Sequence, residues 1–216
     1  MKKPLMFKIS LMHVPLSIAR ECDVPQEDVL AAAGLGQLPN ERSNETVPAD
    51  ALLAAIHHVI EAVDDPQRVA NALDAFPMEV LGLPGFIMRS CPTLGDAFER
   101  FSRYQALLFE GRVATMQMID DGDALLLEAP PVTADTQKDT EIIAARLMVA
   151  VAIGRRLTGV NWSPASASLP THNALGRVCE IYLRCPIEQR EGPARLVLDA
   201  NTLALPIAEN QPDMLD

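Results

Sequence analysis

The chain has 216 residues, of which 49% are apolar and 4% aromatic, and its formal net charge is −11. A compact chain of this length buries roughly 70% of the surface that its unfolded form exposes, so it can fold without disulfide bonds or a metal. Affinity for nucleic acids rests mainly on cations that meet phosphates. We therefore do not expect so acidic a segment to bind DNA by itself.

The sequence contains no targeting or membrane-spanning signal. The N-terminus Met1-Lys2-Lys3-Pro4 carries positive charge, but no long apolar segment with a small-residue cleavage site follows it. No run of 18 apolar residues occurs, so we expect no membrane span and a cytoplasmic location. The four cysteines show no CxxC spacing, and we expect free thiols, with a Cys179–Cys185 bridge as the alternative.

The first third of the chain predicts short helices separated by turns. Pro25 stands at a first helical position and Gly34 lies just past the last turn of the same helix. The clearest apolar stripe belongs to residues 48–63, where apolar side chains recur at helical spacing. Residues 35–46 are rich in Gly, Pro and Asn, so we expect turns there. The expected helices are residues 15–22, 25–33, 48–63 and 65–73, the last of which has Asp65 as its cap.

The strongest helix of the sequence is expected between Thr93 and Gly111. Thr93 is a good N-cap, and Asp96 three residues later completes a variant of the capping box. Phe98, Phe101 and other apolar residues form one face of this helix. Gly111 is a typical C-terminal stop.

The periodicity changes after Gly111 and predicts short strands between further helices. The residues Asp120-Asp121-Gly122-Asp123 are typical of a hairpin turn. The expected strands are residues 112–119, 124–128, 161–169, 187–191 and 195–199, and the expected helices are residues 140–157 and 173–183. We therefore predict an α+β fold, in which an N-terminal helical layer is followed by a small, mostly antiparallel sheet with packed helices.

Motifs that would carry catalysis are absent from the sequence. It contains no HExxH, GxSxG, Walker loop or GxGxxG. The adjacent His57 and His58 point about 100° apart on a helix, so they cannot share one metal ion as an i, i+4 pair could. We expect no catalytic residues, no bound metal and no cofactor, and hence no enzyme.

Three residues are candidates for binding a small molecule: Arg89, Arg103 and Tyr104. Arg103 and Tyr104 lie on a helix whose other face is strongly apolar, and a cation beside an apolar pocket can hold an anionic ligand. The alternative is that Arg103 forms a surface ion pair, while the ring of Tyr104 fills the core with its hydroxyl outward.

An ordered set of short motifs resembles a known sensor module. The set is similar to the arabinose-binding-like N-terminal module of one branch of AraC/XylS transcription regulators, which includes the ornithine-utilisation regulators. Its pattern there is LGLLGY, then SPTLGEAL, then RY on the same helix. The matching residues are Leu81-Gly82-Leu83-Pro84-Gly85-Phe86-Ile87-Met88, Ser90-Cys91-Pro92-Thr93-Leu94-Gly95-Asp96-Ala97-Phe98 and Arg103-Tyr104.

Weaker matches extend the resemblance over nearly the whole chain, and one departure stands out. The family carries an aromatic–Gly pair before a Cys-Pro dipeptide, whereas this chain has Leu183-Arg184 before Cys185-Pro186. The further matches, in chain order, are Val47-Pro48, Asp121-Gly122-Asp123, Leu157-Thr158-Gly159 and Leu205-Pro206.

The resemblance implies a regulatory role and a division of the chain. Residues 1–208 would form a ligand-sensing and dimerisation domain, and residues 209–216 would begin a linker to a C-terminal helix-turn-helix domain that this sequence does not contain. The implied partners are a small-molecule effector and a second copy of the chain. DNA would be contacted only through the C-terminal domain, and no membrane is expected as a partner. The effector pocket is expected between the helical layer and the sheet, and a ligand-free dimerisation module is the alternative.

Overall fold

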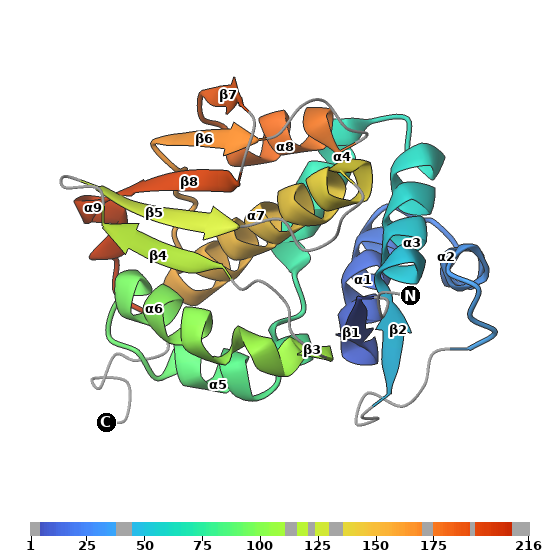
Figure 1. Ribbon diagram of the computed structural model, residues 1–216. Coiled ribbons are helices and arrows are strands. Elements are labelled where there is room, and N and C mark those ends of the chain that lie inside the picture. Colours follow the sequence, from blue (N-terminus) through green and yellow to red (C-terminus); the bar gives the residue numbers. More distant parts are fainter. Residues whose placement is uncertain are drawn as a thin grey trace, which may run out of the picture.

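The computed structural model describes residues 5–37, 45–110, 116–120, 124–129, 136–169, 175–190 and 193–208. A long helix, α7 (Thr136–Thr158), is its central element. The larger sheet has five strands. Figure 1 shows this helix running behind that sheet, with its N-terminal end reaching a separate layer built from the first part of the chain. Three of the four helices that the sequence predicts for the first third of the chain lie in this layer, and they are confirmed.

The N-terminal layer combines these helices with a small antiparallel sheet. Phe7 lies opposite Val47 in one strand pair and opposite Phe109 in the other. The sequence did not predict this sheet, because strands of two or three residues are too short to show a periodicity of two. The elements of the layer are β1 (Met6–Lys8), the 3-10 helix η1 (Ile9–Met12), α1 (His13–Glu21), α2 (Gln26–Ala32), β2 (Thr46–Pro48) and α3 (Ala49–Ala62), and its third strand is β3 (Phe109–Glu110).

The middle of the chain confirms the predicted helix caps. The carboxylate of Asp65 accepts a hydrogen bond of 2.9 Å from the backbone of Gln67, and Thr93 Oγ1 accepts one of 3.2 Å from Asp96 N. The helix after Thr93 ends earlier than predicted, at Tyr104, and tightens into a 3-10 turn. The elements are α4 (Pro66–Ala72), η2 (Leu73–Ala75), η3 (Met78–Leu81), α5 (Leu83–Arg89), α6 (Leu94–Tyr104) and η4 (Gln105–Leu108).

The Gly-Leu-Pro-Gly segment is explained by local geometry. Gly82 has φ 54° and ψ −128°, a conformation that side chains disfavour. Pro84 lies in the first turn of α5, where its missing N–H costs nothing. A Cβ at Gly85 would lie 2.9 Å from Leu81 Cβ, so the close approach of η3 and α5 requires glycine there.

The larger sheet has the strand order β4-β5-β8-β6-β7. All its pairs are antiparallel except β6 with β7. The predicted strand at residues 161–169 is shorter, since it begins only after Pro164. Residues 121–123, predicted as a hairpin turn, lie outside the described residues. The strands are β4 (Gln117–Asp120), β5 (Ala124–Ala129), β6 (Ser166–Leu169), β7 (Ile187–Gln189) and β8 (Ala194–Asp199), with helices α8 (Gly176–Leu183) and α9 (Ala200–Leu203) beside them.

The predicted α+β class is thus confirmed. All four cysteines are free thiols, and burial raises the pKa of Cys179 to about 12, so this thiol is inert near neutral pH. Within the described residues, no helix has both the length and the apolar character that a membrane crossing requires.

Candidate ligand-binding site

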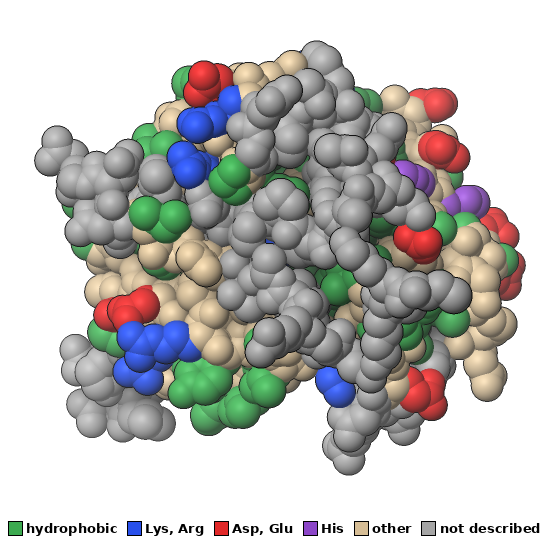
Figure 2. All heavy atoms as spheres, viewed as in Figure 1, with side chains coloured by type: hydrophobic (Ala, Val, Ile, Leu, Met, Phe, Trp, Pro, Cys, Tyr) green, Lys and Arg blue, Asp and Glu red, His purple; other side chains and the backbone are tan. Residues whose placement is uncertain are grey.

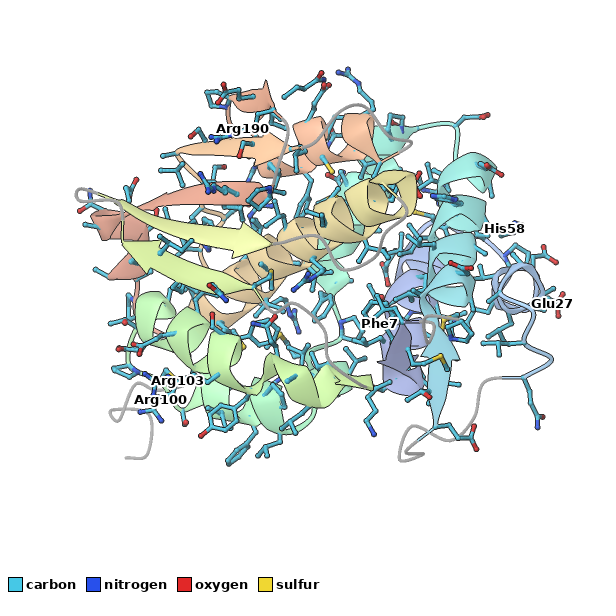
Figure 3. All side chains as sticks on the ribbon, viewed as in Figure 1. Phe7, Glu27, His58, Arg100, Arg103 and Arg190 are labelled. Atoms are coloured by element: carbon cyan, nitrogen blue, oxygen red, sulfur yellow. The ribbon has the colours of Figure 1, made fainter. Side chains whose placement is uncertain are left out.

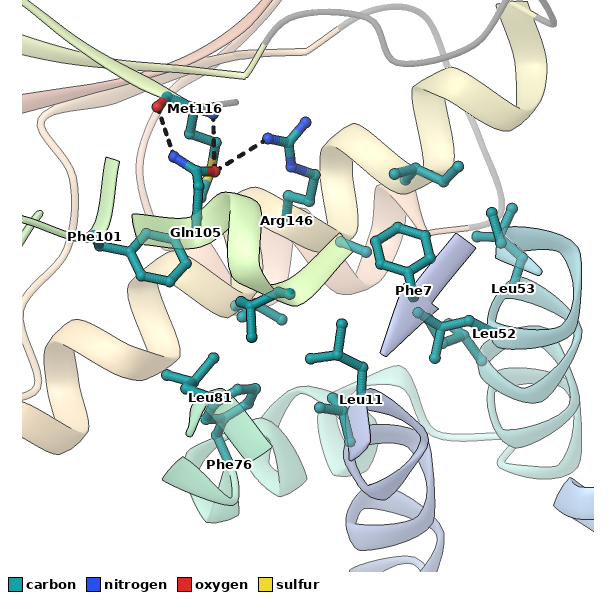
Figure 4. A pocket seen from close by; sticks show the side chains of 17 residues that line it. Phe7, Leu11, Leu52, Leu53, Phe76, Leu81, Phe101, Gln105, Met116 and Arg146 are labelled. Carbon is teal, nitrogen blue, oxygen red and sulfur yellow. Dashed lines mark hydrogen bonds between the residues drawn. The ribbon is translucent and has the colours of Figure 1, made fainter. Parts of the chain in front are cut away.

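A cavity of about 100 Å³ lies between the N-terminal layer and α7. Helices α1 and α3 supply one wall, α7 the opposite wall, and α6 with η4 closes one end (Figure 4). The sequence led us to expect the pocket between the helical layer and the sheet, and α7 is the element that separates the pocket from the sheet. The described lining residues are Phe7, Leu11, Val14, Ala49, Leu52, Leu53, Ile56, Phe76, Leu81, Phe101, Gln105, Leu108, Met116, Ile142, Ala145, Arg146 and Val149.

The wall formed by α7 is one stripe of that helix. Ile142, Ala145 and Val149 are spaced three and four residues apart, so their side chains lie on the same face. Arg146 belongs to the same face and places a guanidinium group among these apolar neighbours. One cation therefore stands on an otherwise apolar wall.

Gln105 is fully buried, and all its polar atoms are engaged. Its Nε2 donates to the carbonyl oxygens of Met116, at 2.8 Å, and of Ser102, at 3.2 Å. Its Oε1 accepts from the backbone N–H of Met116 at 3.0 Å. These bonds fix η4 to the residue that precedes β4.

Arg146 lies beside this amide at the same end of the cavity. Its Nη2 donates to Gln105 Oε1 at 3.5 Å. Burial lowers the pKa of Arg146 to about 10, so the group remains cationic at neutral pH. Figure 4 shows Gln105, Met116 and Arg146 grouped together, with Leu52 and other apolar side chains across the cavity. The cavity is therefore polar at one end and apolar over the rest of its described lining.

A second, smaller cavity of about 40 Å³ continues the apolar part. It shares Val14, Ile56, Ala145 and Val149 with the first cavity. Its described lining is entirely apolar, with further residues from α1, α3, α4 and α8. The apolar space therefore continues from the first cavity toward α4 and α8.

An interlayer contact lies beside the cavity. His57 Nε2 of α3 is 2.9 Å from Glu141 Oε2 of α7, and the carboxylate side chain is 7% exposed. Ile56, which precedes His57, and Ile142, which follows Glu141, both line the cavity. In the described part of the chain, no group of three His, Cys, Asp or Glu side chains is placed to hold a metal ion.

The three candidates from the sequence lie elsewhere. Arg89 Nη2 is 3.6 Å from Glu79 Oε1, Arg103 pairs with Glu99 one helical turn earlier, and Tyr104 is 39% exposed. Figure 3 shows Arg103 beside Arg100, both pointing outward from α6. None of the three belongs to the described lining of the cavity. Arg103 thus forms the surface ion pair considered above, and ligand binding by these residues stays a prediction.

Sequence reasoning missed Gln105 and Arg146. The signal for Arg146 was present, since it is a cation on the apolar stripe of the long helix. Gln105 carried no comparable signal, because its role depends on the backbone of Met116 after an intervening segment of chain.

The fold is also known from a solved structure. The fold is similar to that of the transcriptional regulator CdpR from Pseudomonas aeruginosa, with a TM-score of 0.51 at 17% sequence identity. The likeness covers 89% of this chain and 57% of the CdpR chain, so the chain spans little more than half the length of that protein.

The family follows from the sequence match. A model of the arabinose-binding domain at the N-terminus of AraC transcription regulators matches residues 24–207, and the chain belongs to this family. The resemblance inferred from the motifs is confirmed. Among curated proteins, no match was found.

Proposed function

We propose that this chain is the effector-sensing domain of an AraC-type regulator and acts in the cytoplasm, with a small molecule bound in the cavity between α3 and α7. The observation that carries the proposal is this cavity, which lies between two layers and bears a buried cation at one end. Membership of the regulator family supports the same role. The family and the fold give no support to a catalytic function.

A ligand in the cavity would touch α3 on one side and α7 on the other. An effector shifts an equilibrium only by its differential affinity for the two states. A molecule that fills the cavity would therefore favour the present spacing between the N-terminal layer and α7. Because α7 also packs against the larger sheet, a change in this spacing would be felt by the sheet as well.

The proposed division of the protein has residues 1–208 as the sensor and residues 209–216 as the beginning of a linker. A helix-turn-helix half beyond them would enter the major groove of DNA. The net charge of −11 supports this division, because the cations needed for phosphate contacts would reside in the other half. Reading the coding sequence past codon 216 tests it, and the expected result is a basic segment with two helix-turn-helix patterns.

The sensing role is tested by filling the cavity in the full-length gene. Val149→Phe places a ring where the two cavities meet, and Val160→Phe is the matched control at a position that is 44% exposed. Transcript profiles should differ from wild type for Val149→Phe and match it for Val160→Phe. If both variants match wild type, the cavity has no part in regulation. Arg103→Ala in the same assay tests whether the ligand-binding candidates from the sequence, Arg89, Arg103 and Tyr104, take part in sensing.

A second function, self-association, is favoured by an exposed apolar surface. Phe86 is 72% exposed and Leu83 56% on α5, and Leu107 of η4 is 50% exposed. Figure 2 shows hydrophobic side chains gathered at the lower edge of the face, where Figure 1 places α5. We propose a homodimer through this surface. Light scattering should show that Phe86→Ser is monomeric while Val160→Ser remains dimeric, and a monomeric parent chain would contradict the proposal.

A further inference from the structure

We infer that α6 relays the occupancy of the main cavity to the contact between residues 92–94 and residues 205–207, where the chain approaches the proposed linker. We call this contact the exit seam. The inference rests on the proposed function of the cavity as the effector site, and it names the element that carries the signal out of the domain. It follows from the contacts at the two ends of one helix.

The exit seam fastens the end of the domain to the beginning of α6. Leu94 N donates a hydrogen bond of 2.9 Å to Leu205 O. Ile207 N donates one of 3.2 Å to Pro92 O, and the side chain of Ile207 is buried. An antiparallel β-bridge lies between these two bonds. The chain at residues 205–207 therefore follows the first turn of α6 when that turn moves.

A close approach of α9 adds to the seam. A Cβ at Gly95 would lie 3.3 Å from Leu203 O and 3.4 Å from Leu203 Cβ, so the absence of a side chain lets α6 and the end of α9 come together. Because little space separates the two helices there, a small shift of α6 would press on α9 or release it.

The other end of α6 faces the main cavity. Phe101 lines this cavity, and so do Gln105 and Leu108 of η4, which continues α6. Figure 4 shows Phe101 and Gln105 at the end that α6 and η4 close. The described lining of the smaller cavity includes no residue of α6 or η4. An occupant of the main cavity would therefore touch this helix, whereas a group confined to the smaller cavity would not.

The part of α6 between these ends is closely packed. Phe98 is buried, and its ring meets that of Trp162 edge-on with the centroids 6.4 Å apart. Leu94 is also buried, and a Cβ at Gly154 would lie 3.2 Å from its Cδ1. The helix rises only about 10 Å from Leu94 to Phe101. Densely packed interiors have low compressibility and transmit strain, so a displacement at Phe101 reaches the exit seam.

An occupied cavity should tighten the exit seam. An atom that borders an empty space has no partner on that side and loses the corresponding dispersion contacts. A group that fills the space supplies these contacts to Phe101 and holds α6 in place. Local opening becomes rarer in an element that is better packed. Occupancy of the cavity is therefore expressed as a change in how often the exit seam opens.

Hydrogen exchange of the Leu94 and Ile207 amides, followed by NMR in this chain, measures the opening of the exit seam. Val149→Phe fills space in the main cavity and should slow both amides by about threefold or more. Phe101→Leu enlarges the cavity on the side of α6 and should accelerate both by about threefold or more. The matched control is Ile60→Phe, which places the same ring in the smaller cavity and should leave both rates as in the parent chain.

A reciprocal experiment starts at the exit seam, since coupling between two sites acts in both directions. Gly95→Ala would push Leu203 away from α6 without altering the described lining of the cavity. In the full-length gene it should change the transcripts of the same genes as Val149→Phe and in the opposite direction, because it loosens the seam. The control Gly36→Ala, whose Cβ would meet nothing within 4 Å, should match wild type.

The inference is overturned if the folded variants Val149→Phe and Phe101→Leu leave the two exchange rates unchanged, or if Ile60→Phe changes them as much. If Val149→Phe does not fold, Phe101→Leu and Ile60→Phe decide the question. Failure of the proposed function gives a different result. If the exchange rates respond while Val149→Phe leaves the transcript profile unchanged, the relay holds and the sensing role is wrong. If Val149→Phe changes the profile without a response of the exit seam, the sensing role holds and the relay is wrong.

Discussion

The two halves of α7 are packed in opposite ways. Toward its C-terminus, Gly154 lies so close to Trp162 that even a methyl group would not fit. Toward its N-terminus, Ala145 and Val149 are half-buried and border empty space. The same helix therefore anchors the fold at one end and forms the wall of a cavity at the other. Stability and ligand response can be changed separately along one element.

The two buried arginines of α7 illustrate the same contrast. Arg155 Nε donates to Trp162 O at 2.9 Å, its Nη2 donates to Tyr182 O at 3.1 Å, and its guanidinium lies 4.5 Å from the centre of the Tyr182 ring. Arg146 instead faces the cavity. One cation ties α7 to α8 and to the segment before β6, and the other lies beside Gln105 in the lining of the cavity.

Gly154→Ala should have the largest effect on stability. The added Cβ would lie 2.5 Å from Trp162 Cζ2 and 3.2 Å from atoms of Leu94 and Phe98. Overpacking of this kind should lower the free energy of unfolding by about 3 kcal/mol, which exceeds the gain in helix propensity. Urea denaturation measures it. Gly36→Ala is the control, since its Cβ would meet nothing within 4 Å, and equal effects of the two variants would contradict the close packing of this end.

Arg155→Met should destabilise the chain by about 2 kcal/mol, because two backbone carbonyls lose a charged donor. The matched control is Arg156→Met, the same substitution at the next residue, which is exposed. The difference between the two midpoints in urea measures the contribution of the Arg155 contacts. A difference near zero would show that water replaces the arginine at these carbonyls.

Val149→Phe should change the free energy of unfolding by less than about 1 kcal/mol, because the ring enters existing space. This small effect would sharpen the contrast with Gly154→Ala, which adds a single methyl group to the same helix. Thermal unfolding of the two variants side by side provides the comparison. A loss as large as that of Gly154→Ala would mean that the cavity end is packed as tightly as the other end.

Arg184→Gly should stabilise the chain by about 0.5 kcal/mol. Arg184 ends α8 with φ 53° and ψ 39°, a left-handed conformation that glycine adopts with less strain. Arg184 also lies near Arg155, at the packed end of α7. Burial is the main cause that lowers the pKa of Arg155, and the positive charge of Arg184 lowers it further. Removal of this charge should outweigh the loss of its exposed hydrogen bonds to Asn161. A lower melting temperature would contradict this account.

Local signals predicted much of the fold. The caps at Thr93 and Asp65 and the apolar stripe of α3 identified helices that the structure confirms. Arg184 has a positive φ, which gives a physical reason for the glycine that the resemblance implies at this position. These features depend on residues within a few positions of one another.

The remaining features depend on contacts between distant segments. The parallel pairing of β6 with β7 brings Ala167 opposite Ile187, and no local pattern specifies it. The cavity likewise exists because α3 and α7 meet at a distance that their side chains do not fill. The sequence showed Arg146 on an apolar stripe, but only the packing of the two helices determines that it faces a space.

The amide of Gln105 has one more consequence. Met116 immediately precedes β4, which is an edge strand of the larger sheet, and the side chain of Gln105 both donates to and accepts from its backbone, as a neighbouring strand would. Exposed backbone groups at a sheet edge invite pairing with another molecule. One side chain at the polar end of the cavity thus holds the backbone of the residue at which the edge strand begins its course. The entry of β4 into the larger sheet and the polar end of the cavity therefore depend on the same amide group.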